Sequence, residues 1–176
     1  MKDNFLRKIP NAVFFGVILS VGAILLGFGM GAIFGCAEDE IKNGIERSAS
    51  SVLETVYKSD AAAKDAVVKK SWDYFKRAHM HWGAIGSANL SCIIILILLC
   101  RQSFSVKAVA VLLGFGALIY PVYWLLAGIY APSMGSTGAA KKMLEWLGMP
   151  SSAACLLGVV GTFFCLIRNH FFKSEA

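Results

Sequence analysis

The chain alternates between long apolar stretches and polar segments of very unequal length. A membrane-spanning helix needs about 20 mostly apolar residues. Four stretches qualify, namely Ala12–Gly35, Gly83–Cys100, Val109–Ala131 and Ser151–Ile167. We therefore predict an all-α fold, a bundle of four transmembrane helices. Its parts are residues 1–35 (tail and first span), 36–82 (a polar insert) and 83–176 (the other three spans and the C-terminal tail).

The insert carries its own helical pattern. Ile41, Ile45, Ala49, Val52 and Val56 recur at helical spacing, and Ser59 or Asp60 can cap a second helix. Residues 36–57 and 60–81 would form arms of equal length, about 33 Å each at 1.5 Å per residue. Equal arms favour a projecting antiparallel helical hairpin between the first and second spans. The alternative is two amphipathic helices lying on the membrane surface.

Composition supports the membrane assignment. The chain has 176 residues, of which 57% are hydrophobic and 16% charged, and its mean hydropathy is +0.63. The net charge of +6 arises in the short segments, because the insert holds eight cations and eight acids. This distribution is an orientation signal and gives no indication of nucleic-acid binding. It predicts the N- and C-termini inside, the insert outside, and location in a bacterial inner membrane.

Small residues line one face of the first span. Gly27, Gly31 and Gly35 repeat at four-residue spacing, and Ala154, Gly158 and Gly161 form a similar face in the fourth span. Such faces allow close helix packing, either within the bundle or between copies in a homo-oligomer. Pro121 should bend the third span and free a carbonyl.

Targeting and cysteine patterns are weak. The basic N-terminus resembles a signal peptide, but its apolar run is too long, and Cys36 is a poor lipidation site. The five cysteines form no C-x-x-C motif, so zinc ribbons and covalent c-type haem are excluded. Most of these cysteines should pack as small hydrophobic residues.

The histidines offer the candidate chemistry. His79 and His81 open the second span, whereas His170 lies at the opposite end of the bundle. A helix separates positions 79 and 81 by about 200°, so both cannot face one central ligand. Groups of other spans are expected at the same level. The cofactor-binding candidates are His79, His81, Met134 and Tyr130, and the metal-ligand candidates are His79, His81, Glu38 and Asp39.

These groups suit haem b or a transition metal. The alternatives are a quinone or another ligand, and a purely interfacial histidine pair that caps a helix or binds lipid phosphate. No P-loop, G-x-S-x-G or H-E-x-x-H motif supports soluble catalysis. The chain is therefore expected to be a cofactor-binding membrane protein for electron transfer or sensing. The alternative is a non-catalytic subunit that forms a homo-oligomer or docks a partner through the hairpin.

The stretch RAHMHWGAIG, residues 77–86, resembles the R/V-x-H-x-H-x-x-x-x-G segment of small uncharacterised four-helix membrane proteins. Those proteins are distantly similar to subunit I of the haem-copper oxidases. The resemblance covers about residues 75–168 and implies a haem- or metal-binding ancestry at His79 or His81. The long insert departs from that pattern. The histidines that a haem-copper centre needs are also missing, which argues against oxygen reduction.

Overall fold

The structure is a computed structural model that describes residues 9–172. Within this range the chain forms only helices and connecting turns. The helices are α1 (Asn11–Ser50), α2 (Ala61–Leu99), α3 (Phe104–Met134), α4 (Thr137–Met143) and α5 (Glu145–Phe171). Four of them, α1, α2, α3 and α5, are long and apolar enough to cross a membrane. The predicted all-α fold and its four spans are confirmed, and the chain is an integral membrane protein.

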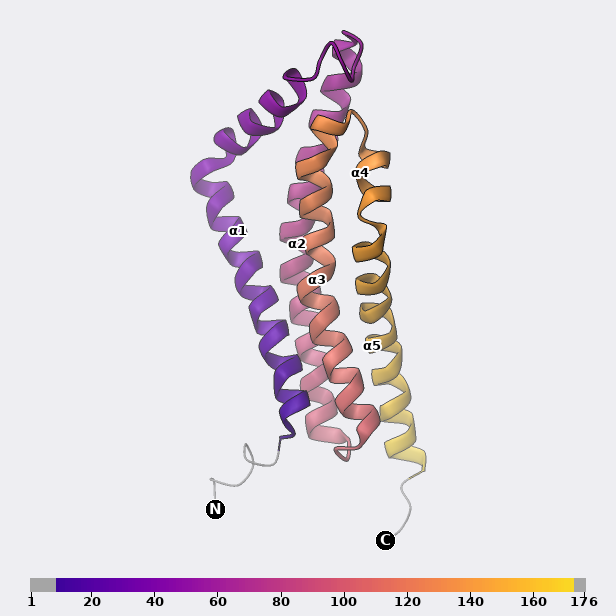
Figure 1. Cartoon of the computed structure of the whole chain (residues 1–176). Coiled ribbons are helices and arrows are strands. Elements are labelled where there is room, and N and C mark those ends of the chain that lie inside the picture. Colours follow the sequence, from indigo (N-terminus) through magenta and orange to yellow (C-terminus); the bar gives the residue numbers. More distant parts are fainter. Residues whose placement is uncertain (1–8, 173–176) are drawn as a thin grey trace.

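The long helices pack around a central pair (Figure 1). α2 and α3 contact each other, and each also contacts both α1 and α5. No contact joins α1 to α5 within residues 9–172. The bundle therefore consists of two three-helix groups that share α2 and α3.

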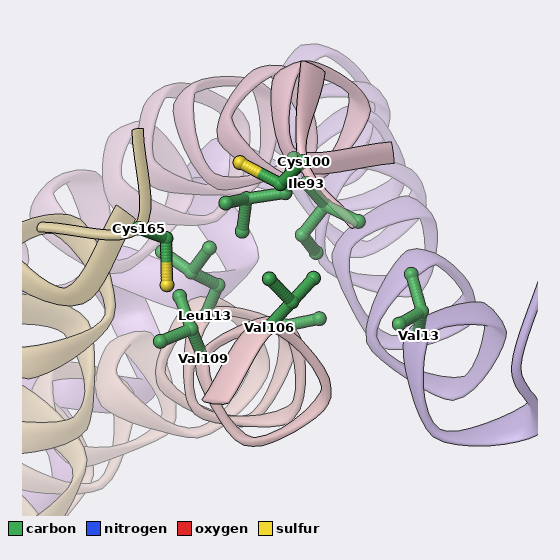
Figure 2. Packing of buried hydrophobic residues seen from close by; sticks show 9 residues of the cluster. Val13, Ile93, Cys100, Val106, Val109, Leu113 and Cys165 are labelled. Carbon is green, nitrogen blue, oxygen red and sulfur yellow. The ribbon is translucent and has the colours of Figure 1, made fainter. Parts of the chain in front are cut away.

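A buried apolar cluster joins α1, α2, α3 and α5 near one end of the bundle (Figure 2). It includes Val13, Ile93, Val106 and Leu113. Cys100 and Cys165 belong to the same cluster, and neither forms a disulfide. These two cysteines pack as small hydrophobic residues, as predicted.

The small-residue faces are used inside the chain. A Cβ atom at Gly27 would lie 2.8 Å from the backbone nitrogen of Gly83 in α2. One at Gly158 would lie 2.8 Å from the side chain of Leu113 in α3. Because glycine has no side chain, the helices approach each other more closely at these positions than alanine would allow. Close packing within the bundle is thus confirmed at Gly27 and Gly158, whereas Gly35 is exposed and no atom lies within 4 Å of a Cβ there.

The insert is helical on both sides of a turn, but its arms differ in length. α1 bends at Ala37, where φ is −140° and ψ is 27°, and ends at Ser50, well before the predicted residue 57. The second arm begins at Ala61, and Asp60 caps it by accepting a hydrogen bond from the Ala63 N–H at 2.9 Å. Matched arms are therefore not what the chain forms, although the predicted cap is confirmed.

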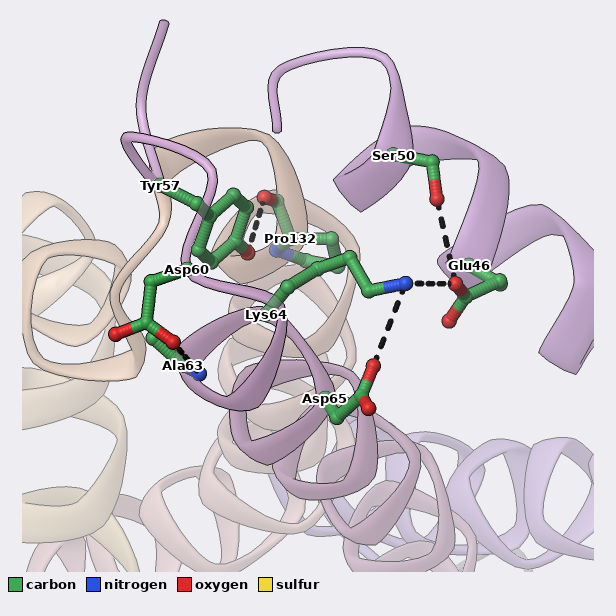
Figure 3. Close-up of polar contacts among 8 residues, drawn as sticks. All are labelled: Glu46, Ser50, Tyr57, Asp60, Ala63, Lys64, Asp65 and Pro132. Carbon is green, nitrogen blue, oxygen red and sulfur yellow. Dashed lines mark hydrogen bonds and ion pairs between the residues drawn. The ribbon is translucent and has the colours of Figure 1, made fainter. Parts of the chain in front are cut away.

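Two polar contacts fix the insert, one between its turn and α3 and one between its two arms (Figure 3). The Tyr57 hydroxyl donates a hydrogen bond to the carbonyl oxygen of Pro132 at 2.7 Å, which connects the turn to the end of α3. Lys64 of α2 forms an ion pair with Glu46 of α1. Gly135 caps α3 with a left-handed φ of 65°, and a Cβ there would overlap Val56 of the turn. Together these contacts hold the turn against α3.

The backbone of α3 keeps helical angles at Pro121, where the sequence predicts a bend. α3 is one helix from Phe104 to Met134 and contains both Pro121 and Pro132. Ala37 in α1 is the residue with non-helical backbone angles inside the described helices. Below, "insert end" means the end of the bundle with residues 38–82, and "link end" means the end where residues 100–103 join α2 to α3.

Candidate functional site

His79 of α2 lies against α1. Its Nδ1 is 2.9 Å from the carbonyl oxygen of Gly27. A carbonyl oxygen can only accept, so Nδ1 carries the proton and donates, which leaves Nε2 as the free lone pair of the neutral ring. A Cβ at Gly31 would lie 2.9 Å from His79 Cε1 and 3.7 Å from Nε2. The imidazole therefore fills the space that the two glycines leave, and Nε2 lies close to the α1 backbone.

An aromatic edge completes the surroundings of His79. The ring of Phe34 meets the imidazole edge-on, with centroids 5.5 Å apart. Phe34 also contacts Trp72. The ammonium nitrogen of Lys42 lies over the Trp72 ring, 5.1 Å from its centroid. These contacts pack α2 against α1 just before the bend at Ala37. His79 is a helix-packing residue in this structure.

His81 lies against α3 instead. Its ring stacks on Tyr120 with centroids 5.5 Å apart and an interplanar angle of 26°. Trp124 lies 6.4 Å away, and the guanidinium of Arg77 sits 4.3 Å over the Trp124 ring. The two histidines thus face different helices, as the angle between positions 79 and 81 predicts.

The α2–α3 seam at this level is richer in aromatic groups than the sequence suggested. We call it the α2–α3 aromatic cluster, and it comprises Tyr74, Arg77, His81, Tyr120, Tyr123 and Trp124. Contacts between aromatic rings and between a cation and a ring each contribute roughly 0.5–1.5 kcal/mol. The helical spacing of Tyr74, Arg77 and His81 on one side of α2 is the sequence signal that could have revealed it.

The other cofactor candidates lie far from the histidines. Tyr130 and Met134 follow Tyr120 by ten and fourteen positions on α3. A helical rise of 1.5 Å per residue places them about 15 and 21 Å further along the helix axis. The structure therefore does not bring Tyr130 or Met134 to the level of His81.

The acidic candidates lie beyond the bend in α1. Glu38 forms an ion pair with Lys42 one turn later, and Asp39 is exposed. Within residues 9–172, no group of three histidine, cysteine, aspartate or glutamate side chains is placed to hold a metal ion. The described residues thus do not gather Glu38 and Asp39 with either histidine into such a group.

Several charges in the insert are paired. Hydrogen bonding to Glu46 raises the pKa of Lys64, and hydrogen bonding to Lys76 lowers the pKa of Asp73. Burial raises the pKa of Tyr57, whose hydroxyl donates to α3. All three shifts favour the protonation states that these residues have near neutral pH, so the insert contacts are intact there.

Two polar contacts inside the spans were not predicted from the sequence. Asn89 is buried and donates to the carbonyl oxygen of Leu113 at 2.8 Å. The indole N–H of Trp82 donates to the carbonyl oxygen of Leu118 at 3.0 Å. The neighbouring carbonyl, that of Ala117, has no intrahelical donor because Pro121 lacks a backbone N–H. An asparagine within an apolar stretch was the available signal for the first contact.

No family model, characterised protein or solved structure matches this chain. The function must therefore be argued from the residues and their geometry.

Proposed function

We propose that this protein is a non-catalytic membrane subunit that docks a protein partner through its insert. The observation that carries the proposal is the position of His79, a partly buried candidate ligand. Its Nδ1 donates to Gly27, and its ring lies against Gly31 and Phe34. The side chain that most resembled a cofactor ligand in the sequence is used to pack α2 against α1.

Haem b does not fit at His79 in this arrangement. An iron ion would have to bind Nε2, which lies close to the α1 backbone at Gly31. A porphyrin is a flat group wider than the space between two packed helices, which approach at about 8–10 Å between axes. Binding there would require α1 to move away from α2 over several turns, with loss of the Gly27–Gly83 contact.

The insert presents a charged surface on a supported backbone. Lys64 and Glu46 join its arms, and Tyr57 joins its turn to α3. Exposed charges of both signs cover the two arms, namely Asp39, Glu40, Lys42, Arg47, Asp65, Lys69 and Lys70. Mixed charges held on fixed helices suit recognition of a protein surface with complementary charges. Gly27, Gly31 and Gly158 are occupied by neighbouring helices of the same chain, so we assign assembly to the insert.

The orientation follows from the remaining charges. Among residues 9–172, the link end carries Arg101, Lys107 and Arg168, while all acidic residues lie at the insert end or in the insert. The positive-inside rule places such an end in the cytoplasm. The insert then faces the periplasmic side of a bacterial inner membrane, where a partner would meet it.

The first test is spectroscopic. The full chain, purified in detergent, should lack a Soret band and hold far less than one equivalent of any transition metal. His79→Ala should lower the melting temperature, because it removes a hydrogen bond and leaves a cavity between α1 and α2. A Soret band that disappears in His79→Ala would overturn the structural role of this residue.

The second test concerns the partner. A photoreactive amino acid at Asp65, on the insert, is compared in intact membranes with one at Leu98, which is exposed in the apolar part of α2. The position in the insert should give one recurrent protein adduct of defined mass, which the position at Leu98 does not give. Equal or absent protein adducts at the two positions would contradict the docking role.

A second candidate is binding of haem b or a transition metal at His81, for electron transfer or sensing. No hydrogen bond to the His81 ring occurs among the described residues, and the buried indole N–H of Trp124 also lacks a partner there. Such polar atoms can serve a bound group. A Soret band or bound metal that persists in His79→Ala but is lost in His81→Ala would favour this candidate.

A further inference from the structure

The link end contains a cavity, lined by both polar and apolar residues, that the proposed docking role does not use. This link-end cavity has a volume of about 360 Å³. The α2–α3 link and the last turns of α5 form its walls, with Val106 of α3 beneath them. Its polar lining consists of Arg101, Ser103, Arg168 and Asn169.

Hydrogen bonds between α5 and the link hold the cavity walls in place. The Arg168 Nη2 group donates to the Ser103 hydroxyl at 3.0 Å. The Asn169 side chain accepts from the Arg101 backbone N–H at 3.2 Å and donates to the Leu99 carbonyl oxygen at 2.6 Å. The Ser103 contact thereby holds the Arg168 guanidinium beside the cavity, and the backbone N–H of Arg101, a second lining residue, is held by Asn169. Each guanidinium has five N–H groups, which leaves donors free for a ligand.

No carboxylate within the described residues can neutralise these cations. The nearest acidic residue along α2 is Asp73, which precedes Leu99 by 26 positions, or about 39 Å of helix. Along α5 it is Glu145, which precedes Arg168 by 23 positions, or about 35 Å. The α3 N-terminus at Phe104 adds a partial positive charge. Within residues 9–172 the link end therefore has cationic groups and a helix N-terminus without a carboxylate, which favours binding of an anion.

An apolar groove continues from the cavity toward the centre of the bundle. This groove, between α3 and α5, has a volume of about 200 Å³ and shares Arg168 and Cys165 with the cavity. Its other lining residues are Ser105, Val109, Gly161 and Phe164. Gly161 precedes Arg168 by seven positions, so the groove extends about 10 Å from the guanidinium into the apolar part of the helices.

We propose that the link-end cavity binds the phosphate headgroup of an anionic glycerophospholipid, with one acyl chain in the α3–α5 groove. Arg101 and Arg168 donate to the phosphate oxygens, as guanidinium groups do in bidentate pairs. The bilayer supplies this anion at the ends of membrane helices, already attached to an apolar chain. A free anion would satisfy the cavity but leave the groove without an occupant, so the combination selects a lipid.

The test uses native mass spectrometry of the full chain in detergent, titrated with phosphatidylglycerol, phosphatidylcholine or inorganic phosphate. We expect one phosphatidylglycerol per chain, bound at least about tenfold more tightly than phosphatidylcholine, since the net charge of the headgroup contributes. Inorganic phosphate should compete only weakly. Equal affinity for the two lipids would overturn charge recognition, and displacement of the lipid by equimolar phosphate would overturn the lipid assignment.

Variants locate the binding. The double variant Arg101→Gln with Arg168→Gln should weaken phosphatidylglycerol binding by about tenfold or more, through loss of charge-assisted hydrogen bonds. Arg47→Gln is the matched control, because it removes an exposed guanidinium from the insert and should change the affinity less than twofold. An effect of Arg47→Gln as large as that of the double variant would place the lipid elsewhere.

Ser105→Trp provides a second measurement that leaves the arginines in place. The indole would fill the groove, so affinity for a two-chain lipid should fall, whereas binding of glycerol 3-phosphate should not change. An unchanged lipid affinity in a variant with the wild-type melting temperature would exclude the groove. The same comparison remains informative if the double arginine variant does not fold.

Discussion

The seam between α1 and α3 at Gly16 offers a sharp test of the packing argument. A Cβ atom at Gly16 would overlap the carbonyl oxygen of Ala110 and lie 2.8 Å from its carbonyl carbon. Conversely, a Cβ atom at Gly114 of α3 would lie 2.6 Å from the carbonyl oxygen of Gly16. The two backbones are thus in direct contact, and Gly16→Ala must push α1 from α3 by roughly 0.5–1 Å. A gap of that size loses a quarter to a half of the attraction between the atoms that line it.

The magnitude follows from two opposing effects. Overpacking of this kind costs about 1–3 kcal/mol. Alanine also favours a helix over glycine by about 1 kcal/mol, which offsets part of that cost. The matched control is Gly29→Ala on the same helix, because no atom lies within 4 Å of a Cβ there. Both variants share the helix-propensity gain, so their difference isolates overpacking at about 1–3 kcal/mol.

The assay is reversible unfolding in mixed micelles titrated with SDS, followed by circular dichroism. Gly16→Ala should unfold at lower SDS than the wild type, and Gly29→Ala at equal or higher SDS. If the two variants proved equally stable, the backbones at Gly16 and Ala110 would not be in contact, and the reasoning from glycine spacing to helix approach would fail.

Three further changes test contacts elsewhere. Tyr57→Phe removes the hydroxyl that donates to Pro132 at 2.7 Å and should cost about 1 kcal/mol in thermal or chemical unfolding. Burial raises the pKa of Tyr57 above its ordinary 10.0, so the folded state holds this proton more tightly. The contribution is complete below pH 10 and is lost as the pH rises through the raised pKa. Ser59→Gly should stabilise by about 1 kcal/mol, because Ser59 adopts a left-handed φ of 63°. Asn89→Ala should cost roughly 0.6–1.7 kcal/mol by removing its donation to Leu113, measured by the same unfolding titration.

Each of these changes has a control in the same chain. Tyr130→Phe removes an exposed hydroxyl and should have no measurable effect on stability. Ser51→Gly places glycine at a right-handed φ of −61°, where it should destabilise and not stabilise. Ser87→Ala removes a bond within its own exposed helix face and should be nearly neutral. A control that matches its test variant in sign and size would refute the assigned contact.

Local patterns in the sequence predicted the features that local forces determine. Apolar runs of membrane length predicted the four spans, and Asp60 was recognised as a cap from its place before an alanine run. Of the three glycines predicted to line the packing face of α1, Gly27 is buried, Gly31 is half-buried and Gly35 is exposed. Each of these features depends on neighbours within one helix or on the apolar environment of the membrane.

The end of α1 depends on long-range contacts instead. The apolar spacing continues through Val52 and Val56, which predicted a helix to residue 57. In the structure, Val56 meets the αL cap at Gly135, and the neighbouring Tyr57 reaches Pro132. These contacts pull the turn onto α3, so the helix ends at Ser50. A periodic pattern records which side chains are buried, but it does not record which partner buries them.

The candidate ligands failed to converge for a related reason. The level of a residue was inferred from its distance to a predicted span boundary, but α3 extends past Tyr120 by several turns before Tyr130 and Met134 occur. The direction of each side chain around its helix depends on which neighbour the helix selects. The angle between His79 and His81 was predictable because it concerns one helix only. Their neighbours, α1 and α3, became known only from the packed structure.

The two ends of the bundle differ in how their charges are satisfied, and this difference separates the two proposals. At the insert end, Lys42 and Lys64 pair with carboxylates, and Arg77 lies over Trp124, so folding itself stabilises these charges. At the link end, Arg101 and Arg168 border a cavity with no carboxylate of the described chain within about 30 Å along α2 or α5. Charges that folding has already paired can present a fixed surface to a protein, whereas arginines without a carboxylate partner among residues 9–172, beside an apolar groove, suit an anionic ligand from the membrane. Loss of lipid binding at the link end should therefore leave partner docking at the insert intact.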